Sequence, residues 1–412
     1  MASGGLAAQA RAESVARASY GRLVAVLAAA NGDIPMAEDA LSDAFVTALS
    51  TWPTVGIPDN PEGWLITVAR NRQRDVWKSA AHLNLTPLDD ATPTESTMDE
   101  LDLDAIPDKR LALMFVCAHP AIDASARTPL MLQTVLGFES AQIATAFALP
   151  HAAMAQRLVR AKRRIKDARI RFAVPERDEM PSRLPAVLEA IYGTYSINWL
   201  VDSGSDTRDS LAGEALYLAV TLASLLGDEP EAFGLAALIC LSMARTAART
   251  SPEGLLIPLG EQDPSLWNTA LIAEGESYLQ RAHDLGRIGR FQLEAAIQSA
   301  HCARATTGVT DWTALRTLYE GLVRLAPTLG ALVSLASTIA ETTGAASGLA
   351  FLDGIDEPAI GRFQPAWATR AHLLVELGRI ADAAVAYDAA ISLTTDAPSR
   401  QLLEARAAAL WS

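Results

Sequence analysis

Residues 137–171 read GFESAQIATAFALPHAAMAQRLVRAKRRIKDARIR, and their apolar spacing predicts two short helices joined by a turn. Ile143 and Phe147 lie four residues apart in the first helix, and Leu149–Pro150 interrupts the pattern. Apolar residues at spacings of four, three and four predict one buried face on the second helix: Met154, Leu158, Ala161 and Ile165. Such an arrangement is typical of a helix–turn–helix, whose second helix enters the major groove of DNA.

The second of these helices is strongly basic. Between residues 157 and 171 one acid, Asp167, stands among eight basic residues: Arg157, Arg160, Lys162, Arg163, Arg164, Lys166, Arg169 and Arg171. A charge run of this kind is often only a solvated helix face. Because it follows directly on the turn, we interpret it as a surface that contacts phosphates with salt-dependent affinity.

An earlier segment, DNPEGWLITVARNRQRDVWKS (59–79), predicts another basic helix, with Asn60 as its cap. Trp64 and Val68 are expected to face inward. Basic and amide side chains gather on another face, beside Trp77: Arg70, Asn71, Arg72, Arg74 and Lys78. A basic stripe next to an aromatic ring suits a nucleic-acid backbone with unstacked bases, and a solvated face over a core Trp64 is the alternative.

The stretch MAEDALSDAFVTALSTW (36–52) predicts an amphipathic helix. Its small and apolar residues recur at helical spacing and are expected to be buried: Ala37, Leu41, Ala44, Ala48 and Trp52. Glu38, Asp39 and Asp43 then form an acidic patch on the exposed side. The residues alone assign no function to this helix.

The charge of the chain is divided unevenly. The formal net charge is −14, of which residues 1–175 contribute −1 and residues 176–412 contribute −13. Three scattered cysteines exclude a disulfide framework and favour a reducing compartment. Since the sequence shows neither a secretory signal nor a membrane span, we expect a cytoplasmic protein. Few lysines among the basic residues indicate a GC-rich bacterial genome.

The periodicities are helical throughout, so the expected fold is all-α. We expect a small helical domain over residues 1–80, a linker over 81–108 and a second helical domain over 109–175. The linker is acidic because residues 79–108 contain eight acids and neither lysine nor arginine. Residues 176–412 are expected to form an acidic all-helical extension.

A 34-residue register relates the windows 296–329, 330–363 and 364–397. Helices are expected to turn at its fifteenth position, which is Thr310, then Gly344, then Gly378. The third window follows the tetratricopeptide pattern through the following residues: Trp367, Ala371, Leu374, Gly378, Ala383, Tyr387 and Ala390. Paired helices packed through these small and aromatic residues are the expectation, with an ordinary Ala-rich bundle as the alternative.

Motifs for catalysis are lacking. Cys117 and His119 stand together in VCAHP without partners at metal-ligand spacing, so we read them as a packed thiol and a helix-end histidine. The sequence contains neither a Gly-rich phosphate loop nor a Gly-x-Ser-x-Gly nucleophile motif. We therefore expect no enzyme activity, no catalytic residue, no metal and no cofactor.

Several of these segments in the same order resemble bacterial RNA polymerase sigma factors of the extracytoplasmic-function class. The closer likeness is to the subgroup with a C-terminal tetratricopeptide-repeat extension. The segments responsible are MAEDALSDAFVTAL, GIPDNPEGWLITVARNR, CAHP, GFESAQIATAFALP, AQRLVRAKRRI, DEPEAFGLAALICL and LGRIADAAVAYDAAI. The resemblance therefore covers nearly the whole chain.

The resemblance implies a role for each helix. The helix around Asp39, Asp43 and Phe45 would dock on core RNA polymerase. The helix from Trp64 to Lys78, with Arg70, Asn71, Arg72 and Arg74, would contact the promoter −10 element and capture a base from the melted single strand. Residues that read the double-stranded −35 element would come from the second module: His151, Arg157, Arg160, Lys162, Arg163 and Arg164.

Two other functions remain open. The chain could be an interaction scaffold whose repeats hold a protein or peptide ligand while its basic helices only tether it to DNA. It could also be a conventional helix–turn–helix regulator, which would normally dimerise on a palindrome. The charge division further predicts that the acidic extension masks the basic helices until a partner displaces it.

Overall fold

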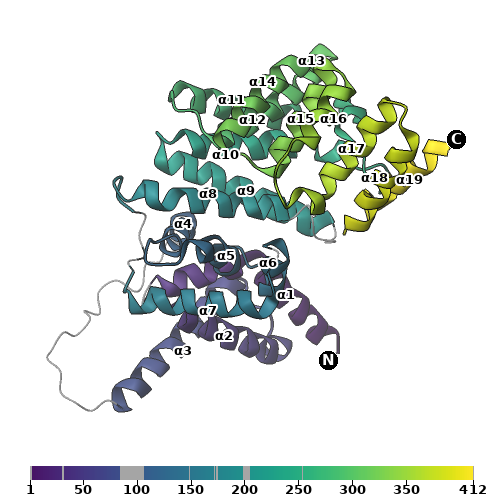
Figure 1. Cartoon of the computed structure of the whole chain (residues 1–412). Helices are drawn as coiled ribbons and strands as arrows, with labels where there is room; N and C mark the ends of the chain where they lie inside the picture. The colour runs from purple at the N-terminus through teal and green to yellow at the C-terminus, as the bar shows by residue number, and fades with distance from the viewer. Residues whose placement is uncertain are drawn as a thin grey trace. The chain divides into compact units, whose positions relative to one another are not determined.

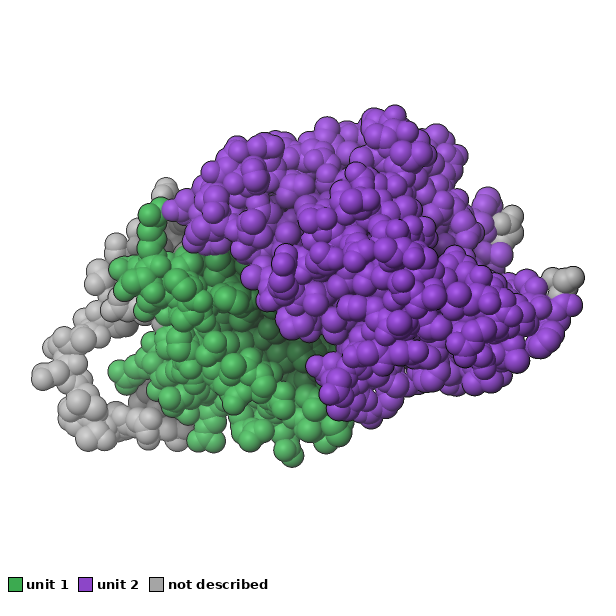
Figure 2. All heavy atoms as spheres, turned by 45° about the horizontal axis from the view of Figure 1, so that its top comes forward, with its two compact units in different colours: residues 1–197 green, residues 198–412 purple. Residues whose placement is uncertain are grey.

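The computed structural model describes residues 2–29, 32–83, 106–147, 149–170, 172, 175–197, 205–252 and 254–411. The chain divides into two compact units, unit 1 over residues 1–197 and unit 2 over residues 198–412 (Figure 2). Every helix or strand element within the described ranges is a helix (Figure 1), which confirms the all-α expectation.

Unit 1 begins with three long helices, α1 (Ala2–Ala28), α2 (Ile34–Val55) and α3 (Pro61–Leu83), which pack against one another. The residues predicted to be buried in α2 are all buried. As predicted, Asn60 caps α3, because its Oδ1 accepts a hydrogen bond of 2.9 Å from the Gly63 amide.

Five further helices complete unit 1: α4 (Ile106–Cys117), α5 (Ala124–Thr134), α6 (Ser140–Ala146), α7 (His151–Asp167) and α8 (Met180–Ile197). Helices α1 and α4 pack together, so the two domains expected from the sequence share one compact unit. Gly21 of α1 also lies directly against the end of α5, since a Cβ there would lie 1.8 Å from the Val135 carbonyl oxygen. The expected linker lies outside the described residues over 84–105.

The end of unit 1 differs from the sequence-based boundary. We placed the start of the extension at residue 176, whereas α8 packs on α4 and α5 and the compact unit continues to Ile197. The reason is an apolar face on α8 that includes Val187, Ala190 and Ile191, each fully buried. The sequence-based boundary rests on the change in net charge at residue 176, and net charge does not reveal an apolar helix face.

Unit 2 is built around α10 (Pro230–Met243), which packs on α9 (Ser205–Leu226), α11 (Thr269–Asp284) and α12 (Arg290–Cys302). The stretch Pro230–Ala248 is long and apolar enough to span a membrane, but 78% of it is buried inside the structure. It therefore behaves as a core helix of this unit.

A half-buried carboxylate joins two of these helices. Glu231, in the first turn of α10, accepts hydrogen bonds of 3.0 and 3.1 Å from the amides of Phe291 and Gln292 at the start of α12. It satisfies amide groups that a helix N-terminus leaves without partners. Gly289 is required beside it, since a Cβ there would lie 2.1 Å from the Glu231 carboxyl carbon.

The short helix α13 (Arg304–Thr307) contacts α12. Each of the helices that follow packs on the next one along the chain: α14 (Trp312–Leu325), α15 (Leu329–Thr343), α16 (Ala345–Asp353), α17 (Gln364–Glu376), α18 (Ile380–Leu393) and α19 (Ala397–Ala408). The predicted turn positions are correct. Gly344 separates α15 from α16 and Gly378 separates α17 from α18, with positive φ angles of 104° and 70° that suit glycine.

Short 3-10 turns connect the longer helices: η2 (Thr246–Ala248), η3 (Leu259–Glu261), η4 (Pro264–Leu266), η5 (Ile360–Arg362) and η6 (Ala409–Trp411). In the third repeat window Ala371, Ala383 and Tyr387 are buried in one cluster against the half-buried Trp367. These small and aromatic residues pack α17 against α18 as the register predicts.

Candidate nucleic-acid interface

Helix α7 has the two faces that the sequence predicts. Its four periodic apolar residues are at most 5% exposed: Met154, Leu158, Ala161 and Ile165. The preceding helix α6 is joined to it by a 2.8 Å hydrogen bond between Ser140 Oγ and His151 Nε2. His151, Val159, Arg160 and Arg163 are exposed on the other side. The second helix of this pair is thus accessible, and Val159 is an exposed apolar side chain that the sequence analysis missed.

Two lysines of α7 are paired with acidic residues, although the side chain of Lys166 stays 62% exposed. Lys162 Nζ lies 2.7 and 2.8 Å from the two carboxylate oxygens of Glu38 on α2, and the two side chains are only 12% and 19% exposed. Lys166 Nζ lies 2.8 Å from the buried Asp33 carboxylate at the start of the same helix, and this contact raises the lysine pKa. The lysines therefore hold α7 against α2.

The arginines of α7 also differ in their surroundings. Arg157 and Arg164 donate hydrogen bonds of 3.3 Å to the carbonyls of Ser125 and Ala121, so they contact the start of α5 and the connection before it. Arg160 donates to a carbonyl of its own helix, and Arg163 pairs with the exposed Asp167 at 3.6 Å. Such exposed contacts are weak, which leaves Arg160 and Arg163 best placed to reach a phosphate.

The VCAHP segment has the structural role predicted for it. Cys117 is fully buried at the end of α4, where burial raises the pKa of its thiol to about 12. His119 Nδ1 accepts a 3.0 Å hydrogen bond from the Ala121 amide, and burial lowers the pKa of the imidazole. The parts of the chain that the structure describes contain no group of three or more His, Cys, Asp or Glu residues that could hold a metal ion.

Helix α3 is rotated relative to the sequence-based expectation. Leu65, Ile66 and Ala69 form its buried side, whereas Trp64 and Val68 are only half-buried. Trp64 packs edge-on against Trp52 of α2, with ring centroids 5.5 Å apart. The expected inward direction of Trp64 and Val68 is thus wrong by about one residue, because α3 contacts both α1 and α2 and buries a wider face.

The basic residues of α3 lie beside that face. Arg70 is half-buried, and burial together with Arg74 lowers its pKa. Asn71, Arg72 and Arg74 are exposed. The side chains of Trp77 and Lys78 lie outside the described residues. Most of the predicted stripe is accordingly accessible to a nucleic-acid strand.

Helix α2 combines acidic and apolar groups on its accessible side. Asp39 and Asp43 are exposed, Phe45 is half-buried, and Arg72 Nε of α3 lies 2.7 Å from Asp43 Oδ2. Glu38 differs from the prediction, since Lys162 covers it. Sequence reasoning also missed Val46 and Leu49, which are 66% and 46% exposed next to the acidic residues. The sequence signal for these two residues is their apolar character on the side of the predicted helix that also carries the acidic residues.

The comparisons with known proteins agree with this arrangement. Residues 15–82, which span α1 to α3, match the family described as Sigma-70 region 2, and residues 183–283 match a family of unknown function (DUF6596). The first match covers the helices that carry the acidic, apolar and basic side chains described above. No solved structure matches the chain.

Three curated proteins show the extent of the similarity. An uncharacterised protein of Rhizobium meliloti is 35% identical over 371 residues, 89% of this chain and 88% of that protein. The ECF RNA polymerase sigma factor SigL of Mycobacterium tuberculosis is 31% identical over 171 residues, 40% of this chain and 92% of SigL. The probable ECF RNA polymerase sigma factor SigI of the same organism is 32% identical over 149 residues, 35% of this chain and 50% of SigI.

The fold, the faces of α2, α3 and α7 and these matches define a helical transcription factor of the sigma-70 class. More narrowly, the chain belongs to the ECF RNA polymerase sigma factors.

Proposed function

We propose that the chain is a sigma factor that binds core RNA polymerase and directs promoter-specific initiation of transcription, without being an enzyme itself. The observation that carries this proposal is α7, which buries four apolar residues and exposes Arg160 and Arg163 within the same unit as the Sigma-70 region 2 match. One unit therefore holds both a polymerase-type module and a helix with the character of a major-groove reader.

Each helix has a distinct role in the proposal. Asp39, Asp43 and Phe45 of α2, extended by Val46 and Leu49, contact the core enzyme. The α3 residues contact the melted −10 strand: Trp64, Arg70, Asn71, Arg72, Arg74 and Lys78. Accessible basic groups support this, because they neutralise phosphates while an aromatic ring stacks on an unpaired base.

Helix α7 reads the double-stranded −35 element through its open face. His151 and Arg160 lie there with Arg163. Arg157 and Arg164 orient α7 through the carbonyls that they contact. Lys162 takes part only once its contact with Glu38 is released.

Unit 2 has a regulatory role in the proposal. Its helix pairs resemble a tetratricopeptide-like array that holds a protein or peptide ligand, and the family match within residues 183–283 is one of unknown function. Residues 198–412 carry a net charge of −11, which favours masking of the basic helices until a partner binds. We place this activity in the cytoplasm, where core polymerase and promoter DNA meet, without a membrane partner.

Capture of bacterial core RNA polymerase by the full-length chain tests the proposal. We expect capture by the native chain and loss of capture by Leu49→Asp, which puts a charge into the apolar part of the α2 face. Val159→Asp is the matched control, because Val159 is 67% exposed on α7 and faces DNA in the proposal. It should retain core binding and lose promoter recognition.

A truncated chain ending at residue 197 separates regulation from recognition, since α8 belongs to unit 1. Stronger promoter binding by this chain than by the full-length protein at low salt supports masking. Equal promoter binding by the two chains contradicts masking and leaves the sigma-factor proposal unaffected. Failure of both chains to capture core polymerase contradicts the sigma-factor proposal and leaves the interaction scaffold or the conventional regulator.

A further inference from the structure

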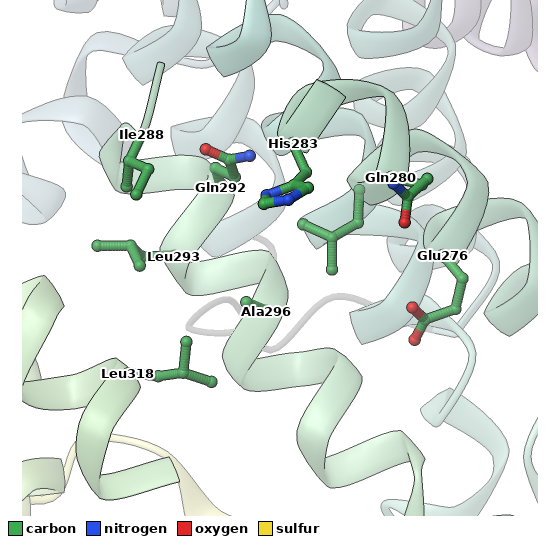
Figure 3. Close-up of a pocket in the computed structure, with 9 residues that line it drawn as sticks. Glu276, Gln280, His283, Ile288, Gln292, Leu293, Ala296 and Leu318 are labelled. Carbon is green, nitrogen blue, oxygen red and sulfur yellow. The ribbon is translucent and has the colours of Figure 1, made fainter. Parts of the chain in front are cut away.

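Unit 2 contains a pocket of about 340 Å³ between α11, α12 and α14 (Figure 3). Its walls are mainly apolar: Leu279, Ile288, Leu293, Ala296 and Leu318. Ile288 is 70% exposed, so its apolar side chain gains little burial from the chain itself. The volume lies at the lower end of the range of roughly 300–1,000 Å³ that small-molecule sites occupy.

One buried polar group in this pocket lacks a partner. The Gln292 side chain lies beside Ile288 and His283 (Figure 3), and the residue is only 6% exposed. Its Oε1 has no hydrogen-bond partner among the described residues. A buried amide oxygen without a donor costs about 1–3 kcal/mol. A ligand with an N–H group can supply that donor.

The charge of the pocket favours a cation. Glu276 on α11 is the one acidic residue among the nine residues that line the pocket, and none of the nine is a lysine or an arginine. The neighbouring Gln280 also lines the pocket, and its amide is held by Asp284 through a 2.8 Å hydrogen bond. The nearby arginines are turned to other groups, since Arg281 lies over the Phe233 ring and Arg290 pairs with Glu294.

We propose that this pocket binds a small organic amine with an apolar body and an ammonium group. The apolar body fills the space between Leu279, Leu293 and Leu318. The ammonium group is attracted by the Glu276 carboxylate, and an N–H donor satisfies Gln292. A carboxylate ligand is repelled by Glu276, and a ligand without a donor leaves Gln292 without a partner.

The test uses the full-length chain and three probes of similar size: phenethylamine, 2-phenylethanol and 3-phenylpropionate. Binding is measured by saturation-transfer NMR and by calorimetric titration. We expect the amine to bind tighter than the alcohol by roughly tenfold, as a charge-assisted hydrogen bond provides. Binding of the carboxylate should be undetectable at the same concentrations.

Variants locate the site. Leu293→Trp and the smaller change Ala296→Leu fill the pocket and should abolish amine binding, whereas Leu325→Trp, at a position 51% exposed on α14, should not. Glu276→Gln should weaken amine binding roughly tenfold, and Glu341→Gln, exposed on α15, should leave it unchanged.

The outcomes decide the proposal independently of polymerase binding, because no transcription assay is involved. Preference for the amine that both pocket-filling variants remove supports it. Amine binding that survives both of these variants overturns the site, and equal binding of the three probes overturns the ligand class. Absence of amine binding to the native chain at millimolar concentration overturns the proposal as a whole.

Discussion

Replacing Lys162 or Glu38 should loosen α7 from α2. At 2.7 Å and an effective dielectric constant of about 20, two unit charges attract each other by ~6 kcal/mol. Most of this attraction offsets the desolvation of two side chains that are only 12% and 19% exposed. We therefore expect a net coupling energy of about 1–2 kcal/mol, within the usual range for residues in direct contact.

A double-mutant cycle with Glu38→Gln and Lys162→Met measures this coupling. Hydrogen exchange of the full-length chain, followed by mass spectrometry, reports the opening free energy of peptides from α7 and α2. Each single variant should increase exchange in both helices. The loss of opening free energy in the double variant should be smaller than the sum of the losses in the two single variants.

The pair Arg163–Asp167 is the internal control. It lies 3.6 Å apart with side chains 82% and 55% exposed, so its coupling energy should stay below ~0.5 kcal/mol. A coupling for Lys162–Glu38 no larger than that of the control would refute the argument that burial strengthens the contact. Increased exchange confined to α7 would show that α2 does not hold it.

Three further predictions follow from other contacts. In DNA titrations of the full-length chain, Arg160→Ala should lower the slope of log affinity against log salt by about 0.9, whereas Lys162→Ala should change it less because Glu38 already pairs with that lysine. Burial lowers the pKa of His301 from 6.5 to about 4, so protonation opposes the fold as pH falls. The free energy of unfolding of unit 2, measured by thermal melts, should therefore fall by up to about 3 kcal/mol between pH 6.5 and 4. Gly289→Ala should destabilise unit 2 in denaturant by about 2 kcal/mol, because its Cβ meets Glu231.

Matched controls accompany these measurements. His301→Gln should remove most of the acid sensitivity of unit 2, since the cations that oppose protonation, Arg245 and Arg304, then face a neutral group. Gly260→Ala should be nearly neutral, because a Cβ there meets nothing within 4 Å. An unchanged pH profile for His301→Gln, or equal effects of the two glycine changes, would contradict the corresponding argument.

Much of the fold was readable from local patterns. The apolar spacing from Met154 to Ile165 predicted the buried face of α7, and Gly344 and Gly378 predicted two turns. Side chains four apart share a helix face whatever the rest of the chain does, and glycine suits a positive φ in any fold. These properties depend on neighbours along the chain, so one sequence is enough to infer them.

Other features required the tertiary structure. Periodicity placed Trp64 of α3 inward, but packing on two helices at once buried Leu65 and Ala69 instead. Charge composition assigned Lys162 to a DNA-facing surface, whereas it contacts Glu38, 124 residues earlier. The pocket around Gln292 likewise joins three helices. Such contacts depend on how helices approach one another, which is set by the packing of many side chains together and not by the spacing within any one helix.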